Sequence, residues 1–421
     1  MSGVEIVPQS GPGDLAPPEV TVVPAPAGPR PGRRTPLSML LPGDASPWTA
    51  RLLFVLFAVG LFALPNVLGE PSEIRQWAEW LCYAMVAVGL DVAWGYGGML
   101  ALGQGLFFGL GAYAMGMHLS LEQVPKGSLP SFMGLYSDYT KLPALWRPFQ
   151  SFWTAAAIAV LVPMLFAGLL GLLVFKRRIR GPFFAILTQA TAVIFALVLI
   201  GNLKLTAGFN GLTGFTKIFG RSKYAPDTNR WLYQVAAVGL LVVLGAAMAL
   251  VRSRYGRLLK ATRDSEDRVR FLGYDPALVK TVGFVVAAGM AGLAGAIAAP
   301  VFGIVSPGQF DAVPSILMLC WVAVGGRGTL WGAVLGALLV NWTRVTVSAA
   351  RPDDWQYLQG LLFVVVLGFI PGGFAGLLRS RYQWLVAMVT GRSGRGGRRP
   401  AGGAQSAVPA GDVADLVGEG A

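Results

Sequence analysis

Six long apolar runs dominate this sequence and limit what it can fold into. They cover 52–68, 154–175, 183–201, 231–251, 282–299 and 358–370. About 20 residues of helix are needed to cross the hydrocarbon core of a membrane, so the last run spans it only if its flanks join it. Inside lipid every backbone N–H and C=O must be paired within the protein, and runs without a two-residue alternation achieve this as helices rather than barrel strands. We therefore predict an all-α, polytopic membrane helical bundle.

Two irregular segments, 95–118 and 312–328, decide how many helices cross the membrane. We expect about ten transmembrane helices, or about eight if these segments are broken or re-entrant. The first of them contains eight glycines between Gly95 and Gly116. Glycines in a membrane helix either let neighbouring helices pack closely or mark a broken helix beside a solute pathway. For the second possibility we name four candidate pathway residues: Gln104, Phe107, Gln189 and Asn210.

Composition excludes a soluble protein and argues against a nucleic-acid partner. Hydrophobic residues make up 54% of the chain and charged residues 13%, with a mean hydropathy of +0.58. The net charge is +13, but the basic residues lie in loops and tails beside the apolar runs, as residues that set membrane orientation do. The two cysteines, Cys82 and Cys320, both lie in apolar stretches, so we predict neither a disulfide framework nor a metal site.

Charge and composition along the chain predict three regions and an orientation. Residues 1–46 are rich in proline and glycine and predict a disordered cytoplasmic tail, and 386–421 predict a second tail that is basic and then of low complexity. The transmembrane domain is expected over 47–385. Basic clusters before the first run, at 176–180, at 252–280 and at 379–381 predict that these segments and both termini are cytoplasmic. The loops 119–150, 202–230 and 301–311 are then expected outside.

The segment 252–280 is the one elaborate charged loop between apolar runs. It holds eight basic and four acidic residues. We predict a helix over 258–272, ended by Gly273 at the position where a helix C-cap favours positive φ. Such a surface helix can dock on a cytoplasmic partner, or it can be a solvated connector.

The sequence contains no sign of an enzyme. It has no Gly-x-x-x-x-Gly-Lys-Ser/Thr phosphate loop, and Gly326-Arg327-Gly328-Thr329 lacks the lysine and the spacing of one. The only histidine, His118, has no partner in sequence for nucleophilic catalysis. The chain resembles a pore whose work is driven through the charged loop by separate proteins.

These residues also resemble a known family. Ala261 and Gly273, with Arg263-Asp264-Ser265-Glu266 between them, are similar to the coupling loop of ABC-importer permeases of the branched-chain amino acid and amide type. The similarity covers most of 80–378, including GYGGMLALGQGLFFGLGAYAMG, GFNGLTGF and WVAVGGRGTLWGAVLGALLVN. Within the family, Gln189, the run 210–215 and RDSEDRVRF resemble the second permease subunit of urea importers. One departure is Gln104, where the family usually has histidine.

The resemblance implies a non-catalytic subunit in a bacterial cytoplasmic (inner) membrane. Its expected partners are a second homologous permease, two cytoplasmic ABC ATPases that bind the ATP and Mg, an extracytoplasmic solute-binding protein and the lipid bilayer; no cofactor is expected in the chain itself. The resemblance assigns ATPase coupling to Ala261, Arg263, Asp264, Ser265, Arg268, Val269, Gly273 and Tyr274. Urea is the expected solute. Branched-chain amino acid or short-amide import is the alternative, and an ATP-independent urea or amide channel is a more remote one.

Overall fold

The computed structural model describes residues 47–125, 128–136, 141–179, 181–223 and 225–350, together with Tyr357, Gly360, Leu361 and Gly373. The two predicted tails and most of the last apolar run lie outside these described residues. The predicted totals of ten or eight crossings and the domain limits therefore stay predictions.

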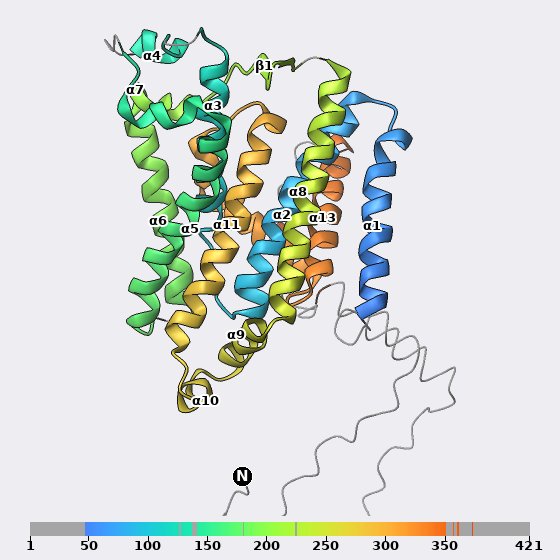
Figure 1. Ribbon diagram of the computed structural model, residues 1–421, viewed down its shortest axis with the longest axis vertical. Helices are drawn as coiled ribbons and strands as arrows, with labels where there is room; N and C mark the ends of the chain where they lie inside the picture. Colours follow the sequence, from blue (N-terminus) through green and yellow to red (C-terminus); the bar gives the residue numbers. More distant parts are fainter. Residues whose placement is uncertain are drawn as a thin grey trace, which may run out of the picture.

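Within the described residues the fold is helical apart from one two-residue hairpin (Figure 1). The helices are α1 (Pro47–Val67), α2 (Pro71–Asp91), α3 (Gln104–Glu122), α4 (Ser131–Tyr136), α5 (Phe152–Lys176), α6 (Pro182–Gly201), α7 (Leu203–Thr206), α8 (Pro226–Arg252), α9 (Arg254–Asp264), α10 (Glu266–Phe271), α11 (Pro276–Phe302), α12 (Ala312–Gly325) and α13 (Leu330–Ala350). The π-helical turn η2 covers Val92–Tyr96, and 3-10 turns cover η3 (Ala144–Gln150), η4 (Gly208–Asn210) and η5 (Pro307–Phe310). Strands β1 (Lys217–Ile218) and β2 (Arg221–Ser222) pair antiparallel.

Five of the described helices are long and apolar enough to cross a membrane: α5, α6, α8, α11 and α13. Shorter apolar helices cover Leu52–Val67 and Val313–Gly325. The prediction of an all-α polytopic membrane protein is confirmed at this level. Five of the described α-helices, α1, α2, α6, α8 and α11, begin with a proline, which fits the first helical position because the N–H that it lacks would have no partner there.

The loops assigned to opposite sides of the membrane lie at opposite ends of the bundle. Helices α4 and α7 and the β hairpin gather at one end, whereas α9 and α10 lie at the other (Figure 1). The loops at the first end are tied together, since Gln123 Nε2 donates a hydrogen bond to the Lys217 carbonyl and Arg75 Nε donates one to the Val301 carbonyl. We call the end with α9 and α10 the coupling end.

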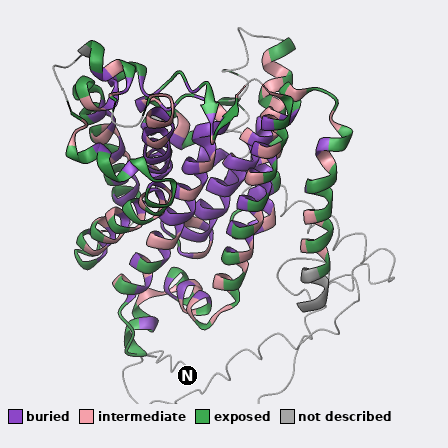
Figure 2. Ribbon diagram, turned by 45° about the horizontal axis from the view of Figure 1, so that its top comes forward, coloured by how far each residue is buried: buried purple, intermediate pink, exposed green. Residues whose placement is uncertain are grey.

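Helix α11 forms the centre of the bundle because its small residues let α3 and α5 come close. A Cβ atom added at Gly295 of α11 would lie 1.9 Å from the Phe108 carbonyl oxygen of α3, and one at Gly292 would lie 2.4 Å from the Ala159 carbonyl oxygen of α5. Figure 2 shows the resulting buried centre surrounded by helices whose outer faces are exposed. These outer faces carry large apolar residues such as Leu165 and Ile194, as expected where lipid is the neighbour.

Two helices begin inside the bundle instead of at its ends. After η2 the chain runs without helical structure over 97–103, and α3 starts next to α6, where the Gly103 N–H donates to Thr188 Oγ1 at 3.3 Å. Thr188 lies about 9 Å along α6 from its first residue, at the helical rise of about 1.5 Å per residue. The turn η5 packs against both α3 and α6, because a Cβ at Gly109 would meet the Phe310 ring and that ring lies 5.7 Å from the ring of Phe195, and α12 follows η5 directly. The segment 95–118 is therefore broken, and the second half of 301–311 lies in the bundle rather than outside it as the sequence suggested.

Close packing of α11 on α3 predicts a strong effect of a single added side chain. We expect Gly295→Val to lower the folding stability by more than the roughly 1–3 kcal/mol typical of overpacking, because its Cβ would collide with backbone and not with a movable side chain. The matched control is Gly245→Val in α8, where the nearest atom to an added Cβ, Phe54 Cζ, lies 3.9 Å away. The unfolding temperature of each variant is measured by heating it with a fluorogenic thiol reagent, because the buried thiols of Cys82 and Cys320 react only when the protein unfolds. Equal unfolding midpoints for the two variants would contradict the packing account.

Candidate functional site

The charged loop forms two short helices and not the single helix predicted over 258–272. Helix α9 starts earlier, at Arg254, where Ser253 Oγ accepts a hydrogen bond of 3.1 Å from the Gly256 N–H and caps the helix. It ends before Ser265, whose extended backbone (φ −161°, ψ 106°) separates α9 from α10. A serine followed by two acidic residues favours a new helix start, and this local preference interrupts the predicted helix.

The turn predicted at Gly273 is confirmed. Gly273 has φ +85°, its N–H donates to the Arg270 carbonyl at 2.9 Å, and the Tyr274 N–H donates to the Val269 carbonyl at 3.3 Å. This pair of bonds is the Schellman motif, which ends α10 and reverses the chain into α11. Nothing lies within 4 Å of an added Cβ at Gly273, so the backbone conformation and not the space requires glycine here.

The tip of the loop presents apolar side chains to the solvent. Phe271 is 92% exposed, Leu272 is 73% exposed and Tyr274 is 54% exposed, next to the exposed Arg268. Val269 is buried and holds α10 to the rest of the loop. Exposed aromatic and aliphatic side chains beside an arginine are typical of a protein-binding surface. Phe271 and Leu272 were not predicted as site residues, although two consecutive large apolar residues just before a chain-reversing glycine are a signal for such a surface.

Helix α9 is anchored on the π-helical turn η2 at the break between α2 and α3. Arg263 Nη1 donates a hydrogen bond of 2.6 Å to the Gly95 carbonyl oxygen, and Lys260 Nζ lies 4.9 Å from the centroid of the Tyr96 ring. Burial lowers the pKa of Lys260, and the positive charge of Arg263 lowers it further. The other predicted coupling residues nearby, Ala261 and Asp264, are exposed, and Asp264 pairs with Arg263 at 2.9 Å. Arg263, for which we expected an ATPase contact, thus binds inside its own chain.

The turn between α12 and α13 holds η2 from a second side. The Gly328 N–H donates a hydrogen bond of 2.7 Å to Asp91 Oδ1, and Arg327 Nη2 donates one of 3.1 Å to the Trp94 carbonyl oxygen. The Arg327 guanidinium also lies 4.9 Å from the Trp94 ring centroid. In the sequence, Arg327 stands out only as part of a segment that lacks the phosphate-loop pattern, so its role here was not predicted. A π-helical turn offers carbonyl groups outside the α-helical pattern, and here the two arginines bind them.

Two of the predicted pathway residues reach one buried layer of the bundle. Gln104 is fully buried in the first turn of α3; its Nε2 donates to the Ala287 carbonyl at 3.2 Å, and its Oε1 has no hydrogen-bond partner among the described residues. Gln189 follows Thr188, which contacts Gly103, and both polar atoms of the Gln189 side chain are buried without a partner in the part of the chain that the structure describes. Unpaired buried amides are costly, so atoms of this kind mark places where a solute or water binds.

The other two predicted pathway residues lie elsewhere. Phe107 belongs to the core, where its ring meets the edge of Phe284 at a centroid distance of 5.3 Å. Asn210 is exposed at the end of the bundle opposite the coupling end, in η4. The structure therefore does not bring Asn210 to Gln104 and Gln189.

The start of α12 lies against the start of α3, which the sequence did not reveal. A Cβ at Gly105 would lie 2.7 Å from Ser315 Oγ and 2.9 Å from the Gln309 carbonyl oxygen. The hydroxyl of Tyr113, further along α3, is also buried without a partner, and its ring lies 5.7 Å from that of Phe310. Two helix N-termini and several unpaired polar atoms thus share one region. Only the sequence Ser306-Pro307-Gly308, which favours a turn inside an expected outside loop, hinted at it.

Comparison with known proteins identifies the family. A family model described as the permease component of branched-chain amino acid transport systems matches residues 78–367. The chain belongs to this family. It is therefore a non-catalytic, multi-pass membrane subunit of the ABC transporter permease type, and its relatives are bacterial inner-membrane permeases.

Individual relatives carry the same description. The high-affinity branched-chain amino acid transport system permease protein LivM of Salmonella typhimurium is 29% identical over 325 residues, which are 72% of this chain and 70% of the relative. The permease proteins BraD of Pseudomonas aeruginosa and LivH of Salmonella typhimurium, both named for the same kind of system, are 24% and 21% identical, each over 70% of this chain and 91% of the relative. No solved structure matches the chain. The comparisons support the amino-acid alternative better than the expected urea-type subunit.

The turn at Gly273 generates a test of the loop. We expect Gly273→Val to leave the protein inserted but to abolish solute uptake, because a β-branched residue resists φ +85° and the tip would reorient. Gly273→Asn should retain uptake, since asparagine tolerates this conformation. Gly220→Val, at a glycine with φ +76° at the opposite end, is the matched control for strain alone. Radiolabelled leucine uptake, normalised to the amount of inserted protein, is the measurement, and full uptake by Gly273→Val would show that the turn is dispensable.

Proposed function

We propose that the chain is one of two related permease subunits of an ATP-driven importer for branched-chain amino acids. In this proposal it forms the pathway with a second homologous permease. Two cytoplasmic ABC ATPases that bind ATP and Mg dock on the coupling end, and an extracytoplasmic binding protein delivers the solute. The chain's similarity both to LivM and to LivH, two permeases named for the same system in one organism, supports a pair of related subunits.

The observation that carries the choice of solute is the meeting of two helix N-termini in the buried layer. An amino acid is a zwitterion, and helix N-termini inside a membrane protein favour its carboxylate through the helix dipole and free N–H groups. The buried Oε1 of Gln104 can accept hydrogen bonds from its ammonium group. Phe310 is buried beside α3 and offers apolar surface to a branched aliphatic side chain.

Coupling would run from the exposed tip of α10 through α9 to the start of α3. Closure of the ATPases on ATP would move the tip, and α9 would transmit the motion as a rigid body, as helices at interfaces do in other switching proteins. The bond between Arg263 and the Gly95 carbonyl would pass that motion to η2. The segment 97–103 would then reposition the first turn of α3, where Gln104 lies.

Urea is the second candidate solute. The unpaired atoms of Gln104 and Gln189 are uncharged amide groups, and they match the donors and the acceptor of urea as well as parts of an amino acid. Asp311 already lies at the start of α12, but α3 has no acidic residue at its N-terminus; urea would leave that terminus without an anion, and this favours the amino acid.

Uptake in cells with and without the chain distinguishes the candidates. We expect deletion to remove most uptake of radiolabelled leucine, isoleucine and valine while leaving urea uptake unchanged, and we expect ATP depletion of wild-type cells to have the same effect as deletion. Loss of urea uptake with unchanged leucine uptake would move the proposal to urea. Flux that survives ATP depletion but not deletion would indicate an ATP-independent channel and would contradict the proposed coupling. Restoring the chain from a plasmid is the control for indirect effects.

A further inference from the structure

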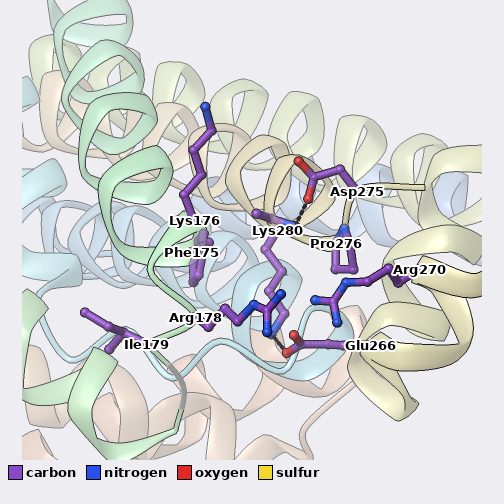
Figure 3. Close-up of a pocket in the computed structure, with 10 residues that line it drawn as sticks. Phe175, Lys176, Arg178, Ile179, Glu266, Arg270, Asp275, Pro276 and Lys280 are labelled. Carbon is purple, nitrogen blue, oxygen red and sulfur yellow. Dashed lines mark hydrogen bonds and ion pairs between the residues drawn. The ribbon is translucent and has the colours of Figure 1, made fainter. Parts of the chain in front are cut away.

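A basic cavity lies at the coupling end, between the end of α5, α10 and the start of α11 (Figure 3). Its volume is about 380 Å³. Four basic residues line it, Lys176, Arg178, Arg270 and Lys280, together with two acidic ones, Glu266 and Asp275. The proposed transport function does not use this cavity.

Both acidic side chains are already bound within the protein. Asp275 Oδ1 caps α11 by accepting a hydrogen bond of 2.9 Å from the Ala277 N–H. Glu266 forms an ion pair with Lys280, and these two side chains are 16% and 13% exposed. Lys280 therefore neutralises Glu266 deep in the cavity, and the more exposed arginines give the mouth a positive charge.

The guanidinium groups of Arg178 and Arg270 enter the cavity from opposite sides, whereas Lys176 points away from it (Figure 3). Arg178 lies in the turn after α5 with φ +58°, a backbone conformation that residues other than glycine, asparagine and aspartate seldom adopt. Arg270 also contacts Asp267 through Nη1 at 3.2 Å, which leaves its other N–H groups available. Two guanidinium groups facing one space suit a phosphate group, whose oxygens accept paired hydrogen bonds.

The position of the cavity matches the surface of a bilayer. Phe175 and Ile179 line it beside the charged residues, and the neighbouring outer faces of α5 and α6 expose Leu173 and Phe183. The apolar surface of α5 thus ends where the basic residues begin, as it does at the level of lipid headgroups.

We propose that this cavity binds a phosphate group through Arg178 and Arg270 and so ties α10 to the end of α5. An anionic lipid headgroup and free phosphate share this chemistry. The bound group would restrain α10, whose tip lies beside the cavity, and would make the position of the coupling loop sensitive to phosphate at this site.

Binding to the purified full chain in neutral detergent tests the proposal in two arms. Native mass spectrometry measures retained phosphatidylglycerol against the zwitterionic phosphatidylcholine, and equilibrium dialysis measures radiolabelled inorganic phosphate. The variant R178Q/R270Q removes the two guanidinium groups. The matched control R252Q/R257Q removes two exposed arginines at the same end but outside the cavity.

We expect R178Q/R270Q to retain about tenfold less phosphatidylglycerol than the wild type and R252Q/R257Q to retain as much as the wild type, given that each basic residue near a membrane surface strengthens anionic lipid binding several-fold. If R178Q/R270Q loses binding of inorganic phosphate but retains phosphatidylglycerol, the site belongs to free phosphate. Equal binding of both ligands by the two variants would overturn the proposal. If thiol exposure shows that R178Q/R270Q is unfolded, R178Q alone is tested instead. It should retain about threefold less phosphatidylglycerol than the wild type. Unchanged retention by R178Q would also overturn the proposal.

Discussion

The hydrogen bond from Arg263 to the carbonyl oxygen of Gly95 is the contact on which the rest of this structure depends. It joins α9, at the coupling end, to the π-helical turn at which α2 gives way to the broken segment before α3. Without it, α9 would touch the turn mainly through Lys260 and the buried Leu259. In the proposed coupling this bond would pass displacement between α9 and the turn, because the guanidinium is planar and its donors are fixed in geometry.

Glycine makes this arrangement possible at two scales. Along α11, glycines let α3 and α5 approach to backbone contact, so the bundle core stays tight although α3 spans only part of it. At the break, Gly98 has φ +72° and lies directly against the Arg263 side chain. The same residue type therefore provides close packing in one place and an unwound segment in another. Close packing and a broken helix, both left open by the sequence, occur together, and a solute pathway beside the break stays a prediction.

Features determined by local sequence could be predicted, and features determined by distant contacts could not. The apolar runs predicted α5, α6, α8 and α11 because helix formation in lipid follows from a continuous apolar segment. The turn at Gly273 was also predictable, since a C-cap depends on a few neighbouring residues. The exposed position of Asn210 and the contact of the α12 start with α3 were not, whereas the break at Ser265 has a local cause, a serine followed by two acidic residues, which the single predicted helix did not take into account. The pairing of Leu212 with Val305 places Asn210, and the packing of η5 in the bundle places Ser315. Neither contact leaves a local pattern in the sequence.

The most direct test of the account joins α9 covalently to the break. A Cβ at position 98 would lie 3.4 Å from the Cβ of Arg263, close to the roughly 3.5–4.5 Å that a disulfide spans. The measurement is ATP-driven leucine uptake by proteoliposomes that contain the assembled importer with G98C/R263C, before and after oxidation, with G98C alone as the control. If α9 and the turn move as one body, the reduced pair transports poorly because the Arg263 bond is gone, and oxidation restores uptake. If oxidation instead stops the remaining uptake, α9 must slide against the turn during transport, and the proposed coupling is wrong.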